Sequence, residues 1–194
     1  MQDLDDLTRL EQAAFAADGF HRQQLRYLLT RANASIYVAD EAGSVQGSAI
    51  MLWRKRTKVG RLYSIATAPS ARGKGVGHLL LQTCEQAAVQ QSCREVSLEV
   101  RITNLSAITF YERHGYRAIE QIPNFYEDGT TALRMRKPLL HRQPCGDNTT
   151  EPATNPGQDA GQINHSSISI GAVQKPWDDA HHHEIRKPGG QERR

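Results

Sequence analysis

The sequence predicts an α/β fold, a mixed β-sheet with helices on its faces. Three observations favour this fold. Apolar residues recur at helical spacing in several segments, they alternate with polar residues in others, and a glycine-rich loop joins a strand pattern to a helix pattern. With 194 residues, the chain is long enough for one domain with a core of its own.

The first half of the chain is expected to form two helices followed by a hairpin. Leu4, Leu7 and Leu10 recur at helical spacing, and a second leucine series follows residue 22. The basic cluster at 54–58 makes the next turn; a solvated hairpin tip is its usual meaning, and contact with an acidic substrate or RNA is the alternative. The predicted elements are helices over 4–15 and 22–29, strands over 35–39 and 46–53, and the turn Asp40-Glu41-Ala42-Gly43 between the strands.

The second half alternates helices with strands. Asn104 is a plausible N-cap for a short helix, and Gly115 is a plausible stop for the same helix. The predicted elements are strands over 62–67, 96–102, 116–122 and 132–136, and helices over 76–90 and 105–114. The overall order therefore places two helices and three strands before a helix, a strand, a helix and two final strands.

A loop rich in glycine and basic residues, Arg72-Gly73-Lys74-Gly75-Val76-Gly77, joins the 62–67 strand to the 76–90 helix. A helix start leaves backbone N–H groups without partners and has a positive dipole end, so it binds anions, phosphate in particular. Gly75 directly after Lys74 excludes a P-loop, and the glycine spacing does not fit a dinucleotide fingerprint. A plain flexible turn is the remaining alternative.

Two side chains are candidates for acid–base chemistry. Alternation places Glu99 on the opposite face of its strand from Leu98 and Val100, in the middle of the sheet. Shielding from water would raise the pKa of this carboxyl and suit it to act as a general base, directly or through one water; a surface glutamate paired with Arg101 is the alternative. Tyr111 lies two helical turns beyond Asn104 and can protonate a leaving group, although a core tyrosine is the more common reading of such a position.

Composition excludes several other classes. A net charge of +3 does not indicate nucleic acid, and no apolar run is long enough for a membrane span or a secretory signal, so a cytoplasmic protein without membrane contact is expected. Cys84, Cys93 and Cys145 have no disulfide-framework spacing. Residues 141–194 are polar and without periodicity, and we interpret them as a mostly disordered tail, with His181-His182-His183 a solvated run and no metal site expected.

Two motifs together give the chain a resemblance to a known superfamily, the GNAT acetyltransferases, across about residues 4–138. Arg72-x-x-Gly75-x-Gly77 after a strand resembles the acetyl-CoA pyrophosphate loop, and Asn104-x-x-Ala107-x-x-Phe110-Tyr111-x-x-x-Gly115-Tyr116 resembles the second signature of that family. Within the group, Leu98-Glu99-Val100-Arg101 before Asn104, and the later Asn124-Phe125-Tyr126-Glu127-Asp128-Gly129, are most similar to the bacterial ribosomal-protein alanine N-acetyltransferase and its relatives.

The resemblance implies acetyl-CoA as co-substrate, with no metal and no covalent enzyme intermediate. It implies that Glu99 is the base that deprotonates the incoming ammonium and that Tyr111 is the acid that returns a proton to the CoA thiolate. Residues of the 62–67 strand would pair with the pantetheine arm, residues of the glycine loop and the following helix would hold the pyrophosphate, and the helix cap would contact the cofactor. These implied cofactor-binding residues are Ile65, Ala66, Thr67, Arg72, Gly73, Lys74, Gly75, Val76, Gly77, His78 and Asn104.

We therefore expect an N-acetyltransferase domain at 1–140, followed by the 141–194 tail. The expected reaction is acetyl transfer to a primary amine, by preference a protein N-terminal α-amine, in a monomer or homodimer. Acetylation of a small-molecule amine is the closest rival, and a non-catalytic acyl-CoA- or RNA-binding module that uses 54–58 is a second. The chain departs from the family where an expected first edge strand is missing and where Thr130-Thr131 replace acidic residues, which bears on acceptor choice.

Overall fold

The computed structural model describes residues 2–14, 22–30, 33–139 and 168–173. Two helices open the described chain and are followed by a β-hairpin. A strand–helix–strand unit, a fourth helix and three further strands come next. The elements are α1 (Gln2–Ala14), α2 (Arg22–Thr30), β1 (Ala34–Glu41), β2 (Ser44–Trp53), β3 (Val59–Thr67), a 3-10 turn η1 (Pro69–Ala71), α3 (Val76–Gln90), β4 (Glu95–Arg101), α4 (Leu105–Arg113), β5 (Arg117–Ile122), β6 (Ala132–Pro138) and β7 (Ile168–Val173).

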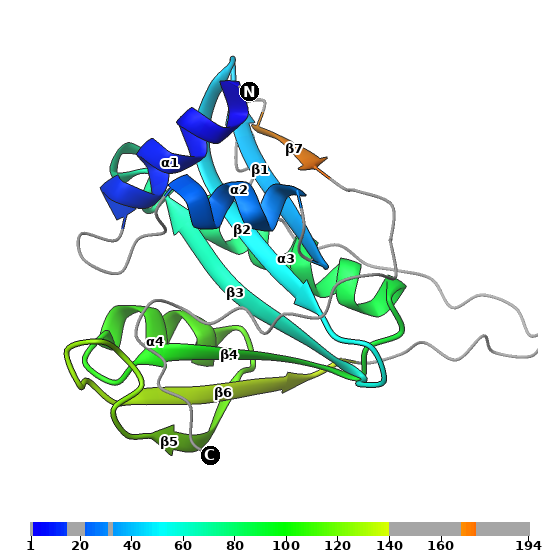
Figure 1. Cartoon of the computed structure of the whole chain (residues 1–194), viewed down its shortest axis with the longest axis vertical. Helices are drawn as coiled ribbons and strands as arrows, with labels where there is room; N and C mark the ends of the chain where they lie inside the picture. Colours follow the sequence, from blue (N-terminus) through cyan, green and yellow to red (C-terminus); the bar gives the residue numbers. More distant parts are fainter. Residues whose placement is uncertain (1, 15–21, 31–32, 140–167, 174–194) are drawn as a thin grey trace, which may run out of the picture.

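The strands form one seven-stranded mixed sheet in the order β5-β6-β4-β3-β2-β1-β7. Every neighbouring pair is antiparallel except β3 and β4, which run parallel and are joined by α3. That parallel pairing is short and joins Val59, Gly60 and Arg61 to Glu95, Val96 and Ser97. Beyond it the two strands diverge, as Figure 1 shows. This divergence positions the candidate site.

Helices cover both faces of the sheet. α1 and α2 pack on one face, where Leu7, Leu25 and Ile50 belong to one apolar cluster. α3 and α4 pack on the other, where Leu80 and Tyr111 belong to a larger cluster. Because side chains alternate along a strand, β1, β2 and β3 each contribute to both clusters.

The predicted α/β fold with a mixed sheet is confirmed, and each predicted helix and strand is present within a few residues of its expected bounds. β7 was not predicted. Ile168 and Ile170 alternate with Ser169 and Gly171, and both isoleucines pack against the α3-side cluster. In the described part of the chain no strand precedes α1, and β7 occupies the edge beside β1. His181, His182, His183 and Cys145 lie outside the described residues.

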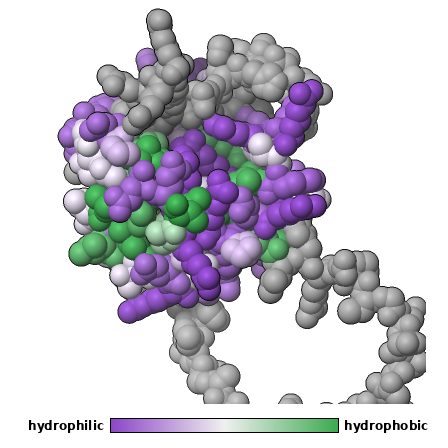
Figure 2. Space-filling view, turned by 90° about the horizontal axis from the view of Figure 1, so that it is seen from below, coloured by the Kyte–Doolittle hydropathy of each residue, from purple (hydrophilic) through white to green (hydrophobic). Residues whose placement is uncertain are grey.

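The surface of the described part is mostly hydrophilic, as the face seen in Figure 2 shows, with hydrophobic residues gathered in patches between polar ones. Large apolar side chains exposed among the described residues are Val89, Leu105 and Ile119. Among these residues no helix combines the length and the apolar character that a membrane crossing needs. Cys84 and Cys93 are both buried and free.

Candidate active site

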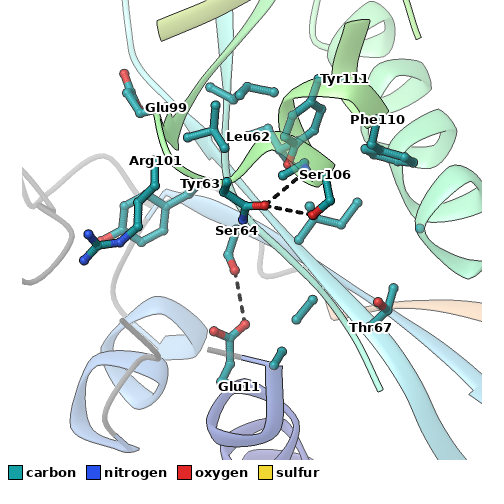
Figure 3. A pocket seen from close by; sticks show the side chains of 18 of the residues that line it. Glu11, Leu62, Tyr63, Ser64, Thr67, Glu99, Arg101, Ser106, Phe110 and Tyr111 are labelled. Carbon is teal, nitrogen blue, oxygen red and sulfur yellow. Dashed lines mark hydrogen bonds between the residues drawn. The ribbon is translucent and has the colours of Figure 1, made fainter. Parts of the chain in front are cut away.

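A cavity of about 420 Å³ begins where the pairing of β3 and β4 ends. Its walls come from β3 beyond Arg61, from β4 beyond Ser97, and from the first turns of α4. Leu62, Leu98 and Tyr111 reach it from the α3 side of the sheet, and Glu11 reaches it from the α1 side. The cavity therefore passes between two strands and is bounded by side chains of both faces, which Figure 3 shows from close by.

The strand β3 offers unpaired backbone to this cavity. On its other edge β3 pairs with β2, in a register that shifts where Ile50 faces Ser64 and Met51 faces Leu62, so Tyr63 is an extra, bulged residue. Bulges redirect backbone groups and are common beside active sites. Ile65, Ala66 and Thr67 follow the bulge and line the cavity along the edge that no described strand covers. An extended polar chain can add there in the manner of another strand, so this edge fits a pantetheine arm.

The glycine loop closes one end of the cavity. Gly73 and Gly75 have φ angles of 77° and 81°, a conformation that favours glycine, and Gly75 is the N-cap of α3. Arg72 and Gly77 line the cavity, and Lys74 is exposed beside them. The first N–H groups of α3 and these cations fit a pyrophosphate. Val76 is only 1% exposed and packs in the core, so its backbone N–H is the group that it can offer.

Asn104 and His78 lie where α4 and α3 meet near the glycine-loop end of the cavity. The Asn104 side chain caps α4 and accepts hydrogen bonds from the Ala107 N–H and the Ser106 hydroxyl, as predicted for an N-cap. His78 on α3 lies 2.6 Å from His114, between Nδ1 and Nε2, and the His114 Nδ1 donates to the Phe110 carbonyl. The two histidines therefore join α3 to the end of α4.

Glu99 is buried, and two arginine side chains balance the negative charge of its carboxylate. Its Oε2 accepts from Arg61 at 2.9 Å, and its Oε1 accepts from Arg134 at 3.0 Å. Burial alone would raise the pKa of Glu99, but the charge of Arg61 and the hydrogen bonds from both arginines outweigh burial and lower it. The expectation of a raised pKa is wrong, because sequence alternation showed which face the carboxyl occupies but not that β3 and β6 bring guanidinium groups to it.

Tyr111 is 7% exposed and lines the cavity from α4. Burial raises the pKa of its phenol, with smaller contributions from Cys84 and Tyr126, so the hydroxyl stays protonated near neutral pH. The side chain is thus both a core residue, as the common reading of the sequence has it, and a potential proton donor.

The structure gathers most of the predicted site residues around one cavity and leaves the others beside it. The predicted residues that line the cavity are Ile65, Ala66, Thr67, Arg72, Gly77, Glu99, Asn104 and Tyr111. Gly73, Lys74, Gly75, Val76 and His78 belong to the adjoining loop and first turn of α3.

The sequence analysis quoted Tyr126 within the 124–129 motif of the family resemblance but did not predict its contact with Arg101 at the cavity. Tyr126 in the β5–β6 loop is buried, and the Arg101 guanidinium lies 4.1 Å from the centre of its ring. Arg101 also donates to Asp128, whose pKa falls to about 2 because the Thr130 backbone N–H and Arg101 both bind it. These residues come from separate segments of the chain, and no local pattern signals their contact. Glu11 was also missed, although an acid at an apolar position of the first helix is a readable signal.

Known proteins with similar sequences and structures show the family of this chain. The sequence profile of the acetyltransferase (GNAT) family matches residues 2–116. An N-alpha-acetyltransferase of Sulfolobus acidocaldarius is 30% identical over 72% of this chain and 89% of its own length. An uncharacterized N-acetyltransferase of Methanocaldococcus jannaschii is 34% identical over 70% of this chain and 86% of its own length.

Solved structures add two similar folds. Ard1 of Thermoplasma volcanium has a TM-score of 0.64 at 28% identity and covers 72% of this chain and 93% of its own. The ribosomal-protein-S18-alanine N-acetyltransferase of Escherichia coli has a TM-score of 0.65 at 22% identity, and the match covers 76% and 95% of the two chains. With the family profile spanning the glycine loop, β4 and α4, the chain belongs to the GNAT family and is an N-acetyltransferase.

Proposed function

We propose that this N-acetyltransferase transfers the acetyl group of acetyl-CoA to the α-amine of a protein N-terminus. The observation that carries the proposal is the cavity between β3 and β4, which has at one end a glycine-rich helix start suited to a pyrophosphate and is lined by carboxylates and a tyrosine. On this proposal the N-terminal residue of the acceptor enters the cavity, and the rest of the acceptor polypeptide stays outside. The similarity to N-alpha-acetyltransferases supports the same acceptor class.

The cofactor would supply a thioester carbonyl for the acceptor nitrogen to attack. On this proposal Arg72, Lys74 and the first N–H groups of α3 hold its pyrophosphate, and the free edge of β3 holds its pantetheine arm. Rate then comes largely from aligning the amine with the thioester. Tyr111, protonated near neutral pH, donates its proton to the leaving thiolate.

Glu99 remains the predicted base. Both of its oxygens already accept from guanidinium groups, so we propose that it takes a proton from the acceptor nitrogen through one water. Its lowered pKa keeps it ionised at neutral pH and also makes it a weaker base than an unpaired glutamate.

Mass spectrometry of the protein incubated with acetyl-CoA tests the acceptor class. The acceptor panel contains alanine-initiated ribosomal peptides, the same peptides with a blocked N-terminus and a free lysine, and common polyamines and amino acids. The proposal expects one acetyl group at the α-amine of free peptides and none on the blocked peptides. Acetylation of the small amines alone would replace it with the small-molecule reaction, and acetyl-CoA binding without any product would favour a binding module.

A further inference from the structure

The first turn of α3 carries a histidine whose ring is bound to a second histidine on α4. His78 Nδ1 lies 2.6 Å from His114 Nε2, and the two ring centres are 4.8 Å apart. His114 is the C-cap of α4 and is half-buried, whereas His78 is exposed. Two ring nitrogens this close share a hydrogen, because two bare lone pairs at this distance would repel each other.

The Phe110 carbonyl fixes where the hydrogens of this pair lie. A carbonyl oxygen only accepts, so His114 Nδ1, which is 2.7 Å from it, carries a hydrogen. In neutral His114 the other nitrogen, Nε2, is then an acceptor, and His78 Nδ1 donates to it. The neutral pair therefore leaves His78 Nε2 as a bare lone pair, which cannot donate to an anion.

One added proton changes what His78 offers to a ligand. When the proton is added at His78 Nε2, the ring becomes a cation that donates from Nε2, and the bond to His114 is kept. If the shared hydrogen then moves to His114, His78 still keeps its hydrogen on Nε2. A second added proton would set one N–H against another and break the contact, so this arrangement holds one added proton.

The pair lies at the helix start where the proposed function, on which this inference rests, places the pyrophosphate. The N-cap of α3 is Gly75, and its carbonyl accepts from the Leu79 N–H at 3.0 Å. The His78 N–H is therefore the last N–H of this helix start that has no intrahelical acceptor. Its side chain projects from the same turn.

Phe110 connects the pair to the wall of the cavity. Its ring centre lies 4.5 Å from that of His114, and both Phe110 and Gly77 line the cavity. A Cβ added at Gly77 would lie 3.7 Å from the Phe110 ring, so the two residues are neighbours. Figure 3 shows Phe110 on α4 at the edge of this space. The histidine pair is thus one residue removed from the cavity on both helices.

The described charged side chains that flank the pair come from the glycine loop, α3, α4 and β6, and none of them binds either histidine. They are Arg72, Lys74, Glu85, Glu112, Arg113 and Lys137. Glu85 and Lys137 bind each other at 2.7 Å. β2 and β3 reach this end of α3 through Gly47 and Thr67, which carry no charge. No acid in this set holds a proton on the pair, so an anionic ligand is the group that would do so.

We propose that His78 donates from Nε2 to the pyrophosphate of the cofactor and that the His78–His114 pair takes up one proton from solvent when the cofactor binds. His114 is the positioning residue, because its bond to the Phe110 carbonyl determines which nitrogen of His78 is left bare. The step balances, since one N–H bond forms with a proton from the buffer and the covalent structure of the cofactor is unchanged. Histidine suits this role because its charge changes between about pH 5 and 8.

Titration calorimetry of the whole protein with dephospho-CoA, without an acceptor amine, counts this proton. Titrations in buffers of equal pH and ionic strength but different ionisation enthalpy give the number of protons taken up per ligand bound. Dephospho-CoA keeps the pyrophosphate and lacks the 3′-phosphate, whose own ionisation at about pH 6 would add to the count. The same titrations with CoA show what the 3′-phosphate contributes.

The variants are His78→Gln, His114→Gln and the control Arg113→Gln, which removes an exposed charge next to His114 and outside the cavity. The thermal midpoint Tm of each variant is recorded, and an unchanged Tm in His78→Gln is expected because that side chain is exposed.

We expect wild-type protein to take up at least about half a proton per dephospho-CoA near pH 7.5 and less near pH 5.5, where a histidine is already charged before the ligand arrives. Binding should accordingly strengthen as the pH falls from 8 to 6.5. His78→Gln should abolish the uptake and weaken binding about 10-fold or more, the value of one charge-assisted hydrogen bond. His114→Gln should reduce the uptake and weaken binding less, because glutamine lets neutral His78 carry its hydrogen on Nε2. Arg113→Gln should match wild type.

Binding of dephospho-CoA to wild-type protein without proton uptake would overturn this inference. So would uptake that persists in His78→Gln, or uptake that occurs with CoA and not with dephospho-CoA, which would assign the proton to the 3′-phosphate. Each of these results leaves the proposed function intact. If wild-type protein binds neither CoA nor dephospho-CoA, the proposed function fails together with this inference.

Discussion

Replacing Glu99 with glutamine tests whether its paired carboxylate supports the fold as well as the chemistry. The Glu99 side chain is 5% exposed, and its partners Arg61 and Arg134 are 19% and 30% exposed. The variant leaves both guanidinium groups without their shared anion, and the glutamine N–H2 turns a donor toward one of them. Glu99 joins β4 to β3 and β6, so the change acts on three central strands.

The expected cost follows from these exposures. Removing one partner of a buried ion pair destabilises a protein by about 3–5 kcal/mol. Arg134 is partly exposed and also binds Glu120, so solvent and that second acid still compensate part of its charge in the variant. The free energy of unfolding is therefore expected to fall by about 3 kcal/mol, the lower end of this range. With a urea m-value of about 2 kcal/mol/M, the unfolding midpoint should fall by about 1.5 M.

The pH dependence has a definite sign. The pKa of Glu99 is lowered in the folded protein from its reference value of 4.5, so the folded state binds its proton less readily than the unfolded chain. Its stabilisation is therefore fully present above that reference value and is lost as the pH falls through the lower, folded value. The difference in stability between wild type and Glu99→Gln should be constant from pH 8 to 6 and should shrink below 4.5.

Urea unfolding of both proteins from pH 8 to 4 measures this difference, and a double-mutant cycle with Arg134→Gln isolates the pair. A coupling energy of about 0.5–3 kcal/mol is expected for groups in one network. An unchanged midpoint in Glu99→Gln, or a difference that grows on acidification, would refute the reasoning. Activity is then compared only under conditions where both proteins are folded.

Three further substitutions, one of them with a matched control, test other parts of the protein. Tyr111→Phe should lower kcat about 10²-fold while acetyl-CoA affinity stays unchanged, and full turnover would remove the tyrosine from its role as proton donor. Gly75→Ala forces alanine into a φ of 81°, and about 1–2 kcal/mol of stability should be lost together with acetyl-CoA affinity by calorimetry. Gly43→Ala, at the same φ in the β1–β2 turn, is its matched control and should lose stability alone. Gly47→Ala places a Cβ 2.9 Å from the Ala66 carbonyl oxygen and 2.9 Å from Leu80, and Tm should fall by the equivalent of about 1–3 kcal/mol; an unchanged Tm would mean that β2 and α3 are less closely packed.

Periodicity predicted the fold because the central elements carry it strongly. The β4 segment alternates strictly, and α3 keeps apolar residues at helical spacing over its whole length, so local patterns and tertiary packing agree. β7 escaped because its short alternation is embedded in a polar segment, and its pairing with β1 is a contact between distant parts of the chain. No local rule indicates such a contact.

In the candidate site, too, the features set by local sequence were predicted and those set by distant contacts were not. The glycine loop and the Asn104 cap depend on backbone conformation that the local sequence dictates, and both were predicted. The environment of Glu99 depends on Arg61 and Arg134, which lie 38 and 35 positions away in the sequence. Their effect on the pKa of Glu99 was therefore predicted with the wrong sign. Burial is readable from alternation, but the charge that accompanies burial is a tertiary property.

The position of the site follows from the one parallel junction in the sheet. Parallel neighbours need a crossover, and α3 supplies it between β3 and β4. A crossover helix begins near the carboxyl end of the strand that precedes it, so the N-terminus of α3 meets β3 at the end where the strands have already separated. The same topology therefore opens the cavity, leaves this edge of β3 unpaired in the described structure, and brings to the mouth of the cavity a helix start of the kind that binds anions. Glu99, Tyr111 and Glu11 then project from β4, α4 and α1 into a space that the connectivity has already made.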